Sequence, residues 1–141
     1  TEKMPFLRIA PICNGKIYVA PRSYQGEEPG KLDIPMEDYI YACKTDTDKY
    51  AKEVENKYSN HITGQPEPRF SLKHLVKETN GVKKTIMLYI LPLNDEEQIH
   101  FTGGKFVTPE EIEMNSAQYS SFLKEEIDHL NIVTQMWEEF K

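Results

Sequence analysis

The sequence predicts one α+β domain, in which a mixed β-sheet lies between an amphipathic helix and a long C-terminal helix. Three observations predict this class: two Asn-Gly pairs that join strand-like segments, an apolar run without a polar face, and two segments with helical spacing of apolar residues. The chain has 141 residues, the usual length of a single domain, so residues 1–141 are expected to fold as one unit.

Two antiparallel hairpins are predicted from the Asn-Gly pairs. A type I′ turn needs positive φ at both central residues, which Asn-Gly tolerates better than other pairs. In the second hairpin, residues 86–91 are apolar on both faces, which predicts a central strand covered on two sides. The pairs and the strands that they join are Asn14-Gly15 between residues 6–13 and 16–21, and Asn80-Gly81 between residues 70–78 and 82–91.

Helices are expected to supply this cover. Residues 46–58 carry apolar side chains at helical spacing, with Thr45 or Asp46 available to cap the start. Residues 116–140 repeat apolar side chains in steps of three and four, which predicts one long helix. Between sheet and long helix, residues 108–111 read Thr-Pro-Glu-Glu, a capping box with proline at the first helical position, which predicts a short helix.

The composition excludes several classes of function. The longest apolar run, residues 86–93, is too short to cross a bilayer, so we expect no membrane span and a cytoplasmic protein. A formal net charge of −6, with lysines scattered among acids, argues against a nucleic-acid partner. Cys13 and Cys43 show no ligand spacing, which argues against a structural zinc site. A small anionic ligand in a local basic pocket and a homodimer both stay open.

Four short stretches of the chain are each weakly specific for a protein family, but their order and spacing together are more specific. Residues 16–22 form a strand ending in arginine, and residues 30–35 read Gly-Lys-Leu-Asp-Ile-Pro. Residues 52–59 read Lys-Glu-Val-Glu-Asn-Lys-Tyr-Ser, and residues 106–112 form a late strand and turn before the last helix. Together they resemble the Nudix (MutT-like) hydrolase superfamily over most of the chain. The resemblance implies a Nudix-like α/β/α sandwich.

Members of this family are typically metal-dependent hydrolases that cut a nucleoside diphosphate linked to another group. Their helix places carboxylates at i, i+3 and i+4, so that three acids converge on Mg²⁺ or Mn²⁺. The corresponding residues here are Glu53, Asn56 and Lys57, and Met36-Glu37 stands where the family has Gly-Gly. These departures from the family pattern predict a degenerate motif with no metal site, impaired catalysis and no resident cofactor. Mg²⁺ or Mn²⁺ is expected only if a hydrolase activity persists.

Candidate site residues follow from the resemblance and from charge. Glu53 is the candidate catalytic residue because it is the one acid of the triplet that remains, although a solvated helix acid or an ion pair with Lys49 or Lys57 also explains it. Arg22 stands where the family has a basic residue near its cleft, so phosphate binding and a structural role are both open. The candidate ligand-binding residues are Arg22, Glu37, Asp38, Lys57 and His74.

Two further sets of acids have a functional and a structural explanation. A displaced carboxylate site is one explanation of the acids near the first helix, yet acids just ahead of a helix are favoured by its dipole. Glu110 and Glu111 offer a late base, but the capping box already explains Glu111. The acids of the displaced set are Glu37, Asp38, Asp46 and Asp48.

Three functions remain open, and whether the protein is an enzyme is among the open points. The leading hypothesis is a ligand-binding or regulatory module that recognises a nucleotide or another phosphorylated small molecule without cutting it. The second is an active pyrophosphohydrolase with a rearranged carboxylate set drawn from Glu37, Asp38, Glu53 and the late acids Glu110 and Glu111. The third is a protein-interaction domain that uses an apolar stripe at residues 136–140, although core packing of the last helix also explains the stripe.

Overall fold

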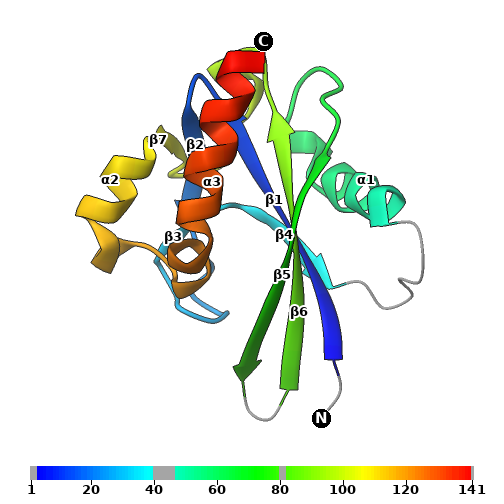
Figure 1. Cartoon of the computed structure of the whole chain (residues 1–141), viewed down its shortest axis with the longest axis vertical. Coiled ribbons are helices and arrows are strands. Elements are labelled where there is room, and N and C mark those ends of the chain that lie inside the picture. Colours follow the sequence, from blue (N-terminus) through cyan, green and yellow to red (C-terminus); the bar gives the residue numbers. More distant parts are fainter. Residues whose placement is uncertain (1–2, 40–46, 80–81, 141) are drawn as a thin grey trace.

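The centre of the molecule is a mixed sheet with helices on both faces (Figure 1). The computed structural model describes residues 3–39, 47–79 and 82–140, and seven strands lie within these ranges. The strands are β1 (Lys3–Cys13), β2 (Lys16–Pro21), β3 (Leu32–Asp33), β4 (Met36–Tyr39), β5 (Arg69–Thr79), β6 (Val82–Pro92) and β7 (Lys105–Val107). The helices are α1 (Thr47–Lys57), α2 (Pro109–Met114) and α3 (Ser121–Phe140), with short 3-10 turns η1 (Ser59–His61), η2 (Glu96–Gln98) and η3 (Ser116–Gln118).

Strand β1 organises the sheet. It runs parallel to β6 along most of its length. Its other edge is shared by two strands, because β4 pairs with Phe6–Ile9 and β2 pairs with Ile12 and Cys13. Strands β2 and β4 therefore lie along the same edge of β1 and diverge from each other. Strand β3 lies in the segment that connects them.

Both predicted hairpins are present. Asn14 and Gly15 have φ values of 53° and 75°, the positive values that a type I′ turn needs. Strands β5 and β6 pair antiparallel as expected. The Asn80-Gly81 pair between them lies outside the described residues.

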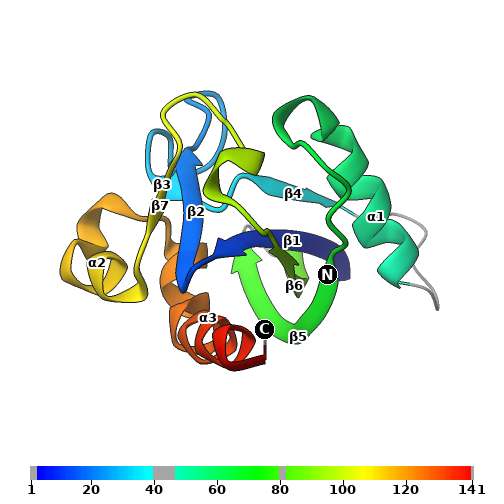
Figure 2. The same ribbon diagram turned by 90° about the horizontal axis from the view of Figure 1, so that it is seen from above.

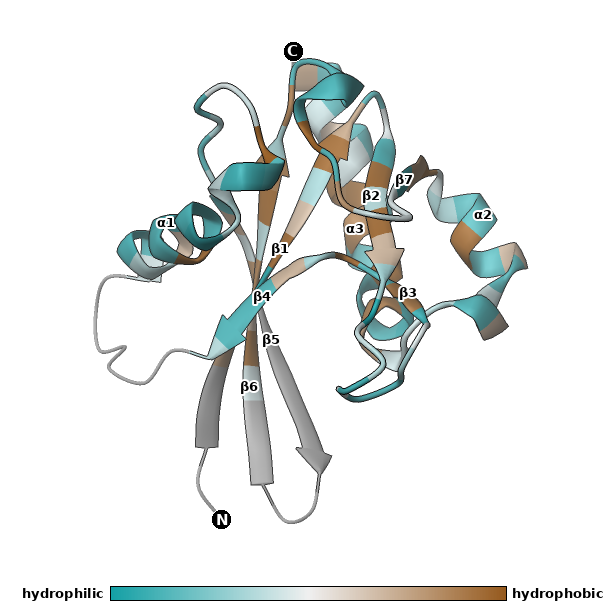
Figure 3. Cartoon of the chain, turned by 180° about the vertical axis from the view of Figure 1, so that it is seen from behind, coloured by the Kyte–Doolittle hydropathy of each residue, from teal (hydrophilic) through white to brown (hydrophobic). Residues whose placement is uncertain are grey.

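Helices α1 and α3 cover opposite faces of the sheet, as predicted (Figure 2). Alternate residues of β6 face the two layers: Tyr89 and Leu91 pack with α1, whereas Leu88 and Ile90 pack with α3. Hydrophobic colour accordingly concentrates in the strands between the helices, and the ribbon of α1 is mostly hydrophilic (Figure 3). None of the helices in the described ranges is long and apolar enough to cross a membrane.

The last helix begins later than the sequence predicts. The expected start at Ser116 is wrong: the turn η3 comes first, and α3 starts at Ser121. Tyr119 is extended and buried, and the Ser120 amide donates to the carbonyl of Leu32 at 2.9 Å. This pairing with the β3 segment holds the chain extended, so the helix can form only after it. The short helix α2 has the predicted capping box, with Thr108 accepting from the amide of Glu111.

Candidate functional site

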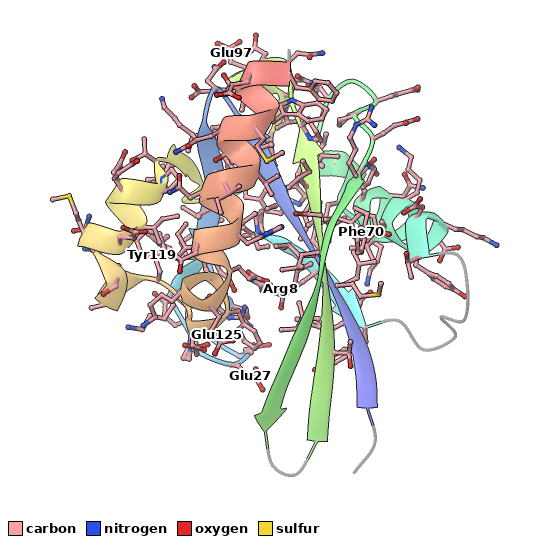
Figure 4. The ribbon with its side chains drawn as sticks, in the orientation of Figure 1. Arg8, Glu27, Phe70, Glu97, Tyr119 and Glu125 are labelled. Atoms are coloured by element: carbon pink, nitrogen blue, oxygen red, sulfur yellow. The ribbon has the colours of Figure 1, made fainter. Side chains whose placement is uncertain are left out.

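A fully buried arginine lies at the centre of the most charged part of the interior. Arg8 on β1 lies between the sheet and α3 (Figure 4). Its Nε and Nη2 each donate to Glu126 at 2.8 Å, and Nη2 also donates to Asp33 at 2.7 Å. Its Nη1 donates to Glu37 at 2.5 Å. One guanidinium thus joins β1, β3, β4 and α3.

A second arginine joins the same acids from the outside. Arg22, which is half-buried after β2, donates to Asp33 at 2.5 Å and lies 3.5 Å from Glu37. Its Nε donates to the Glu27 carbonyl at 2.8 Å. We call Arg8, Arg22, Asp33, Glu37 and Glu126 the charge cluster.

The acids of the charge cluster titrate differently because their surroundings differ. Burial alone would raise the pKa of Asp33, but Arg8 and Arg22 together outweigh it, and the pKa of Asp33 is lowered. Burial raises the pKa of Glu37, and the attraction of Arg8 does not cancel this effect. Glu37 is therefore the acid of the two that takes up a proton first as the pH falls.

The sequence patterns do not single out Arg8, Asp33 or Glu126, although a signal exists for two of them. Arg8 interrupts an apolar strand, and in β1 it faces α3 while Leu7 and Ile9 face α1. Glu126 lies four residues from both Phe122 and Leu130, on the buried face of α3. A charge at a core position of a strand and another at a core position of a helix are expected to meet when the two pack together.

A cleft opens beside the charge cluster, where β2 and β4 diverge. Its volume is about 480 Å³, within the usual range of small-molecule sites. The charged side chains at its surface are Arg22, Glu27, Asp33 and Glu37. The structure thus brings two predicted ligand-binding residues, Arg22 and Glu37, to one cavity.

Aromatic side chains also line the cleft. Tyr58 follows α1, His61 ends η1, and Phe101 lies in the loop before β7. The His61 and Phe101 rings stack with centroids 4.0 Å apart, and Tyr58 lies 5.8 Å from Phe101. The buried Tyr18 hydroxyl accepts from the Phe101 amide at 2.8 Å, which fixes this loop. We call Tyr58, His61 and Phe101 the aromatic wall.

The surface of α1 that would carry the family's metal does not fit a divalent cation. Glu53 and Asn56 are exposed, and Lys57 forms an ion pair with Asp38 on β4. Glu55 points inward and is paired with Lys52 at 2.8 Å. Since Mg²⁺ and Mn²⁺ favour several oxygen ligands with negative charge, an acid, an amide and an ammonium make a poor donor set.

The displaced carboxylate set is not assembled either. Adjacent residues of β4 point to opposite faces, so Glu37 meets Arg8 whereas Asp38 meets Lys57. Asp48 accepts a hydrogen bond from the Tyr89 hydroxyl at 2.7 Å. Asp46 lies outside the described residues. Over the described ranges, the structure contains no group of three or more acidic, histidine or cysteine side chains placed to hold a metal ion.

Three further candidates are His74, Glu110 and Glu111. His74 is on β5 opposite Ile86, and its side chain lies outside the described part of the structure. Glu110 is exposed on α2, and Glu111 serves the capping box as the sequence indicates.

The apolar stripe of the last helix divides into two parts. Trp137 packs against the α3 side of the core, with the Arg69 guanidinium 5.4 Å from its ring centroid. Met136 and Phe140 are exposed and line a groove of about 1120 Å³ with Phe70, which is labelled in Figure 4. Binding of a protein partner at this groove stays a prediction.

No protein-family model and no curated protein matches the sequence. Solved structures do match. A MutT protein from Methanosarcina mazei Go1 has a TM-score of 0.64 at 13% identity, covering 93% of this chain and 96% of its own. A Nudix hydrolase from Nitrosomonas europaea has a TM-score of 0.59 at 13% identity, and the match covers 94% of this chain and 91% of that hydrolase. The C-terminal domain of mouse MUTYH, solved in complex with human PCNA, has a TM-score of 0.56 at 16% identity, and the match covers 99% of this chain and 90% of that domain.

These likenesses extend over nearly the whole chain, and at such low identity they concern the fold. They agree with the order of strands and helices described above and with the resemblance in the sequence. The chain therefore has a Nudix-like α+β fold, and its sequence has diverged far from those of the Nudix and MutT structures that share it.

Proposed function

We propose that this Nudix-like domain is a ligand-binding or regulatory module, which takes a small molecule in the cleft and does not hydrolyse it with a divalent metal. The observation that carries the proposal is the ion pair between Lys57 and Asp38. In the family motif an acid corresponds to Lys57, whereas here an ammonium stands there and neutralises a nearby carboxylate. A nucleotide or another phosphorylated molecule is the ligand that the family resemblance implies.

The electrostatic cost of a metal ion on α1 is large. At about 4 Å and an effective dielectric constant of about 20, two unit charges interact by roughly 4 kcal/mol, so an ammonium beside a divalent cation costs about twice as much. Lys57 is exposed enough to swing into solvent, but it would then lose its partner Asp38. Glu53 would then be the one anionic ligand at the three motif positions of this helix.

A pair of substitutions tests whether the charge of α1 excludes a divalent cation. The double variant Asn56→Glu, Lys57→Glu places an acid at each of the three motif positions of α1. We expect it to bind Mn²⁺ measurably in isothermal titration calorimetry, whereas the wild-type protein does not. Adding Glu53→Gln to the double variant should weaken that binding again. Wild-type turnover of any substrate in a nucleoside-diphosphate panel, dependent on Mg²⁺ or Mn²⁺ and lost in Glu53→Gln, would overturn the proposal in favour of the hydrolase.

Binding itself is tested by thermal shift in the presence of a chelator. A ligand at a hundred times its Kd adds roughly 2.7 kcal/mol to the free energy of unfolding. We expect at least one nucleoside, nucleotide or sugar phosphate to raise Tm without metal. If every compound in such a panel leaves Tm unchanged, small-molecule binding is wrong.

A further inference from the structure

The charge of the cleft differs from that of a site built for phosphate. Arg22 is the one described lining residue with a permanent positive charge, and its guanidinium lies 2.5 Å from Asp33 and 3.5 Å from Glu37. Beneath the cleft, Arg8 is bound to the same two carboxylates and to Glu126 on α3. The charge cluster holds two arginines against three acids, so its positive charge is already balanced. A phosphate group entering here would meet no surplus cation.

The aromatic wall is the second feature of the cleft that bears on its ligand. Its three rings line the cleft, and aromatic faces favour flat, polarisable partners, including nitrogen heterocycles. Hydrogen bonds fix the wall, because the His61 carbonyl accepts from the His100 amide at 2.9 Å and Tyr58 donates to the Glu37 carbonyl at 3.1 Å. Burial raises the pKa of Tyr58, which keeps this hydroxyl protonated.

The third feature of the cleft is a hydrogen-bond acceptor at its surface, the carboxylate of Glu37. Its side chain is 21% exposed, whereas Asp33 and Glu126 are buried. Arg8 and Arg22 both approach its Oε1 atom. Among the described residues, no hydrogen bond uses Glu37 Oε2, so this atom can accept an N–H from a ligand.

We infer that the cleft selects a planar nitrogen heterocycle without a phosphate group, neutral or cationic, which stacks on the aromatic wall and donates an N–H to Glu37. The inference rests on the proposed binding function and names a ligand class for it. It differs from the phosphorylated ligand that the family resemblance implies, because the balanced arginines give phosphate no advantage.

Matched ligands separate the two classes. The probes are adenosine, guanosine and cytidine, their 5′-diphosphates, and inorganic pyrophosphate, each titrated calorimetrically into the protein in chelator. We expect at least one nucleoside to bind, its diphosphate to bind no more tightly, and pyrophosphate alone not to bind.

Two variants locate the binding. Glu37→Gln keeps the shape but removes the charge, and a hydrogen bond to a charged group is worth enough that nucleoside affinity should fall about tenfold. Phe101→Leu keeps an apolar side chain but removes the stacking surface, with a similar expected loss. The control Glu113→Gln makes the same chemical change on the exposed surface of α2 and should leave the affinity unchanged. Far-UV circular dichroism checks that each variant is folded.

The outcomes are distinguishable. If the diphosphates or pyrophosphate bind more tightly than the nucleosides, the inference is wrong while the proposed binding function stands. If neither Glu37→Gln nor Phe101→Leu weakens nucleoside binding in folded protein, the assigned site is wrong. If none of these probes binds, the inference is wrong, and the proposed binding function is overturned only if the wider thermal-shift panel also leaves Tm unchanged.

Discussion

At the scale of single residues, Arg8 is the side chain on which most others depend. It is fully buried, and it contacts Asp33, Glu37 and Glu126, which come from three different elements. A buried ion pair adds little net stability over a well-packed apolar alternative, but removal of one partner leaves the others charged in a medium of low dielectric constant. The charge cluster is therefore sensitive to the loss of any member.

The substitution Arg8→Met should lower the free energy of unfolding by about 3–5 kcal/mol, because it leaves Asp33 and Glu126 without their main partner. Urea denaturation measures this change. The matched control Lys57→Met removes an exposed ion pair with Asp38 and should cost no more than about 1 kcal/mol. Equal effects of the two substitutions would contradict the central role of Arg8.

The pH dependence of Glu37 has a definite sign. Its pKa in the folded state is raised above the ordinary value of 4.5, because burial outweighs the attraction of Arg8. The folded state therefore holds the proton to higher pH than the unfolded state, and this contribution to stability is lost as the pH rises from 4.5 through the folded-state pKa.

Because glutamine does not titrate, the stability of wild-type protein relative to Glu37→Gln should fall as the pH rises above about 4.5 and then level off. Urea denaturation of both proteins at pH values from 4 to about 8 tests this sign. A difference that grows in favour of the wild type over this range would show that Arg8 lowers the pKa of Glu37 instead.

At the scale of elements, the start of α3 depends on a loop that is distant in sequence. Glu28, between β2 and β3, accepts from the Ser121 amide at 2.9 Å and from the Ser121 hydroxyl at 2.8 Å. A carboxylate at this end also interacts favourably with the helix dipole. The Ser120 hydroxyl accepts from the Leu123 amide at 3.1 Å, so two side chains share the capping of one helix.

Glu28→Ala should lower the free energy of unfolding by about 1 kcal/mol through the loss of this cap. Glu28 has a φ of 49°, and alanine also carries a Cβ, so the backbone strain is similar in both proteins. The control Gln25→Ala, exposed in the same loop, should change stability by less than about 0.5 kcal/mol. Thermal unfolding distinguishes the two, and equal losses would indicate that the loop and not the cap matters.

At the scale of the whole molecule, two hydrophobic layers share one sheet. Leu91 is fully buried in the layer beside α1, and Trp137 lies at the edge of the layer beside α3. Because β1 and β6 contribute side chains to both layers, loss of one layer removes the support of the other. Unfolding is therefore expected to be one cooperative transition.

The substitution Leu91→Ala should lower the free energy of unfolding by about 2–5 kcal/mol. Trp137 is the one tryptophan of the chain, so its fluorescence reports on the α3 layer, while far-UV circular dichroism reports on all elements. In urea, we expect the unfolding transitions of the Leu91→Ala variant followed by fluorescence and by circular dichroism to coincide. A circular-dichroism change that precedes the fluorescence change would show that the α1 layer unfolds on its own.

The sequence by itself determined most of the local elements and the residue types at the three positions that the family resemblance aligns with a metal motif. Asn14-Gly15 forces a hairpin through its φ requirements, and apolar spacing places α1 and most of α3, because both effects act between near neighbours in the chain. The residue types Glu53, Asn56 and Lys57 likewise set the net charge of these three positions to zero, because a formal charge depends on the residue type alone.

Only the tertiary structure decided which charged side chains meet. Arg8 and Glu126 are 118 residues apart, and their contact needs β1 and α3 to pack face to face. The pairing of β3 with β2 and of β4 with β1 places Asp33 and Glu37 beside Arg22, whereas the sequence leaves a role in phosphate binding open for this arginine. Such pairings depend on long-range geometry, which local periodicity does not contain. The ion pair of Lys57 with Asp38, between α1 and β4, has the same origin.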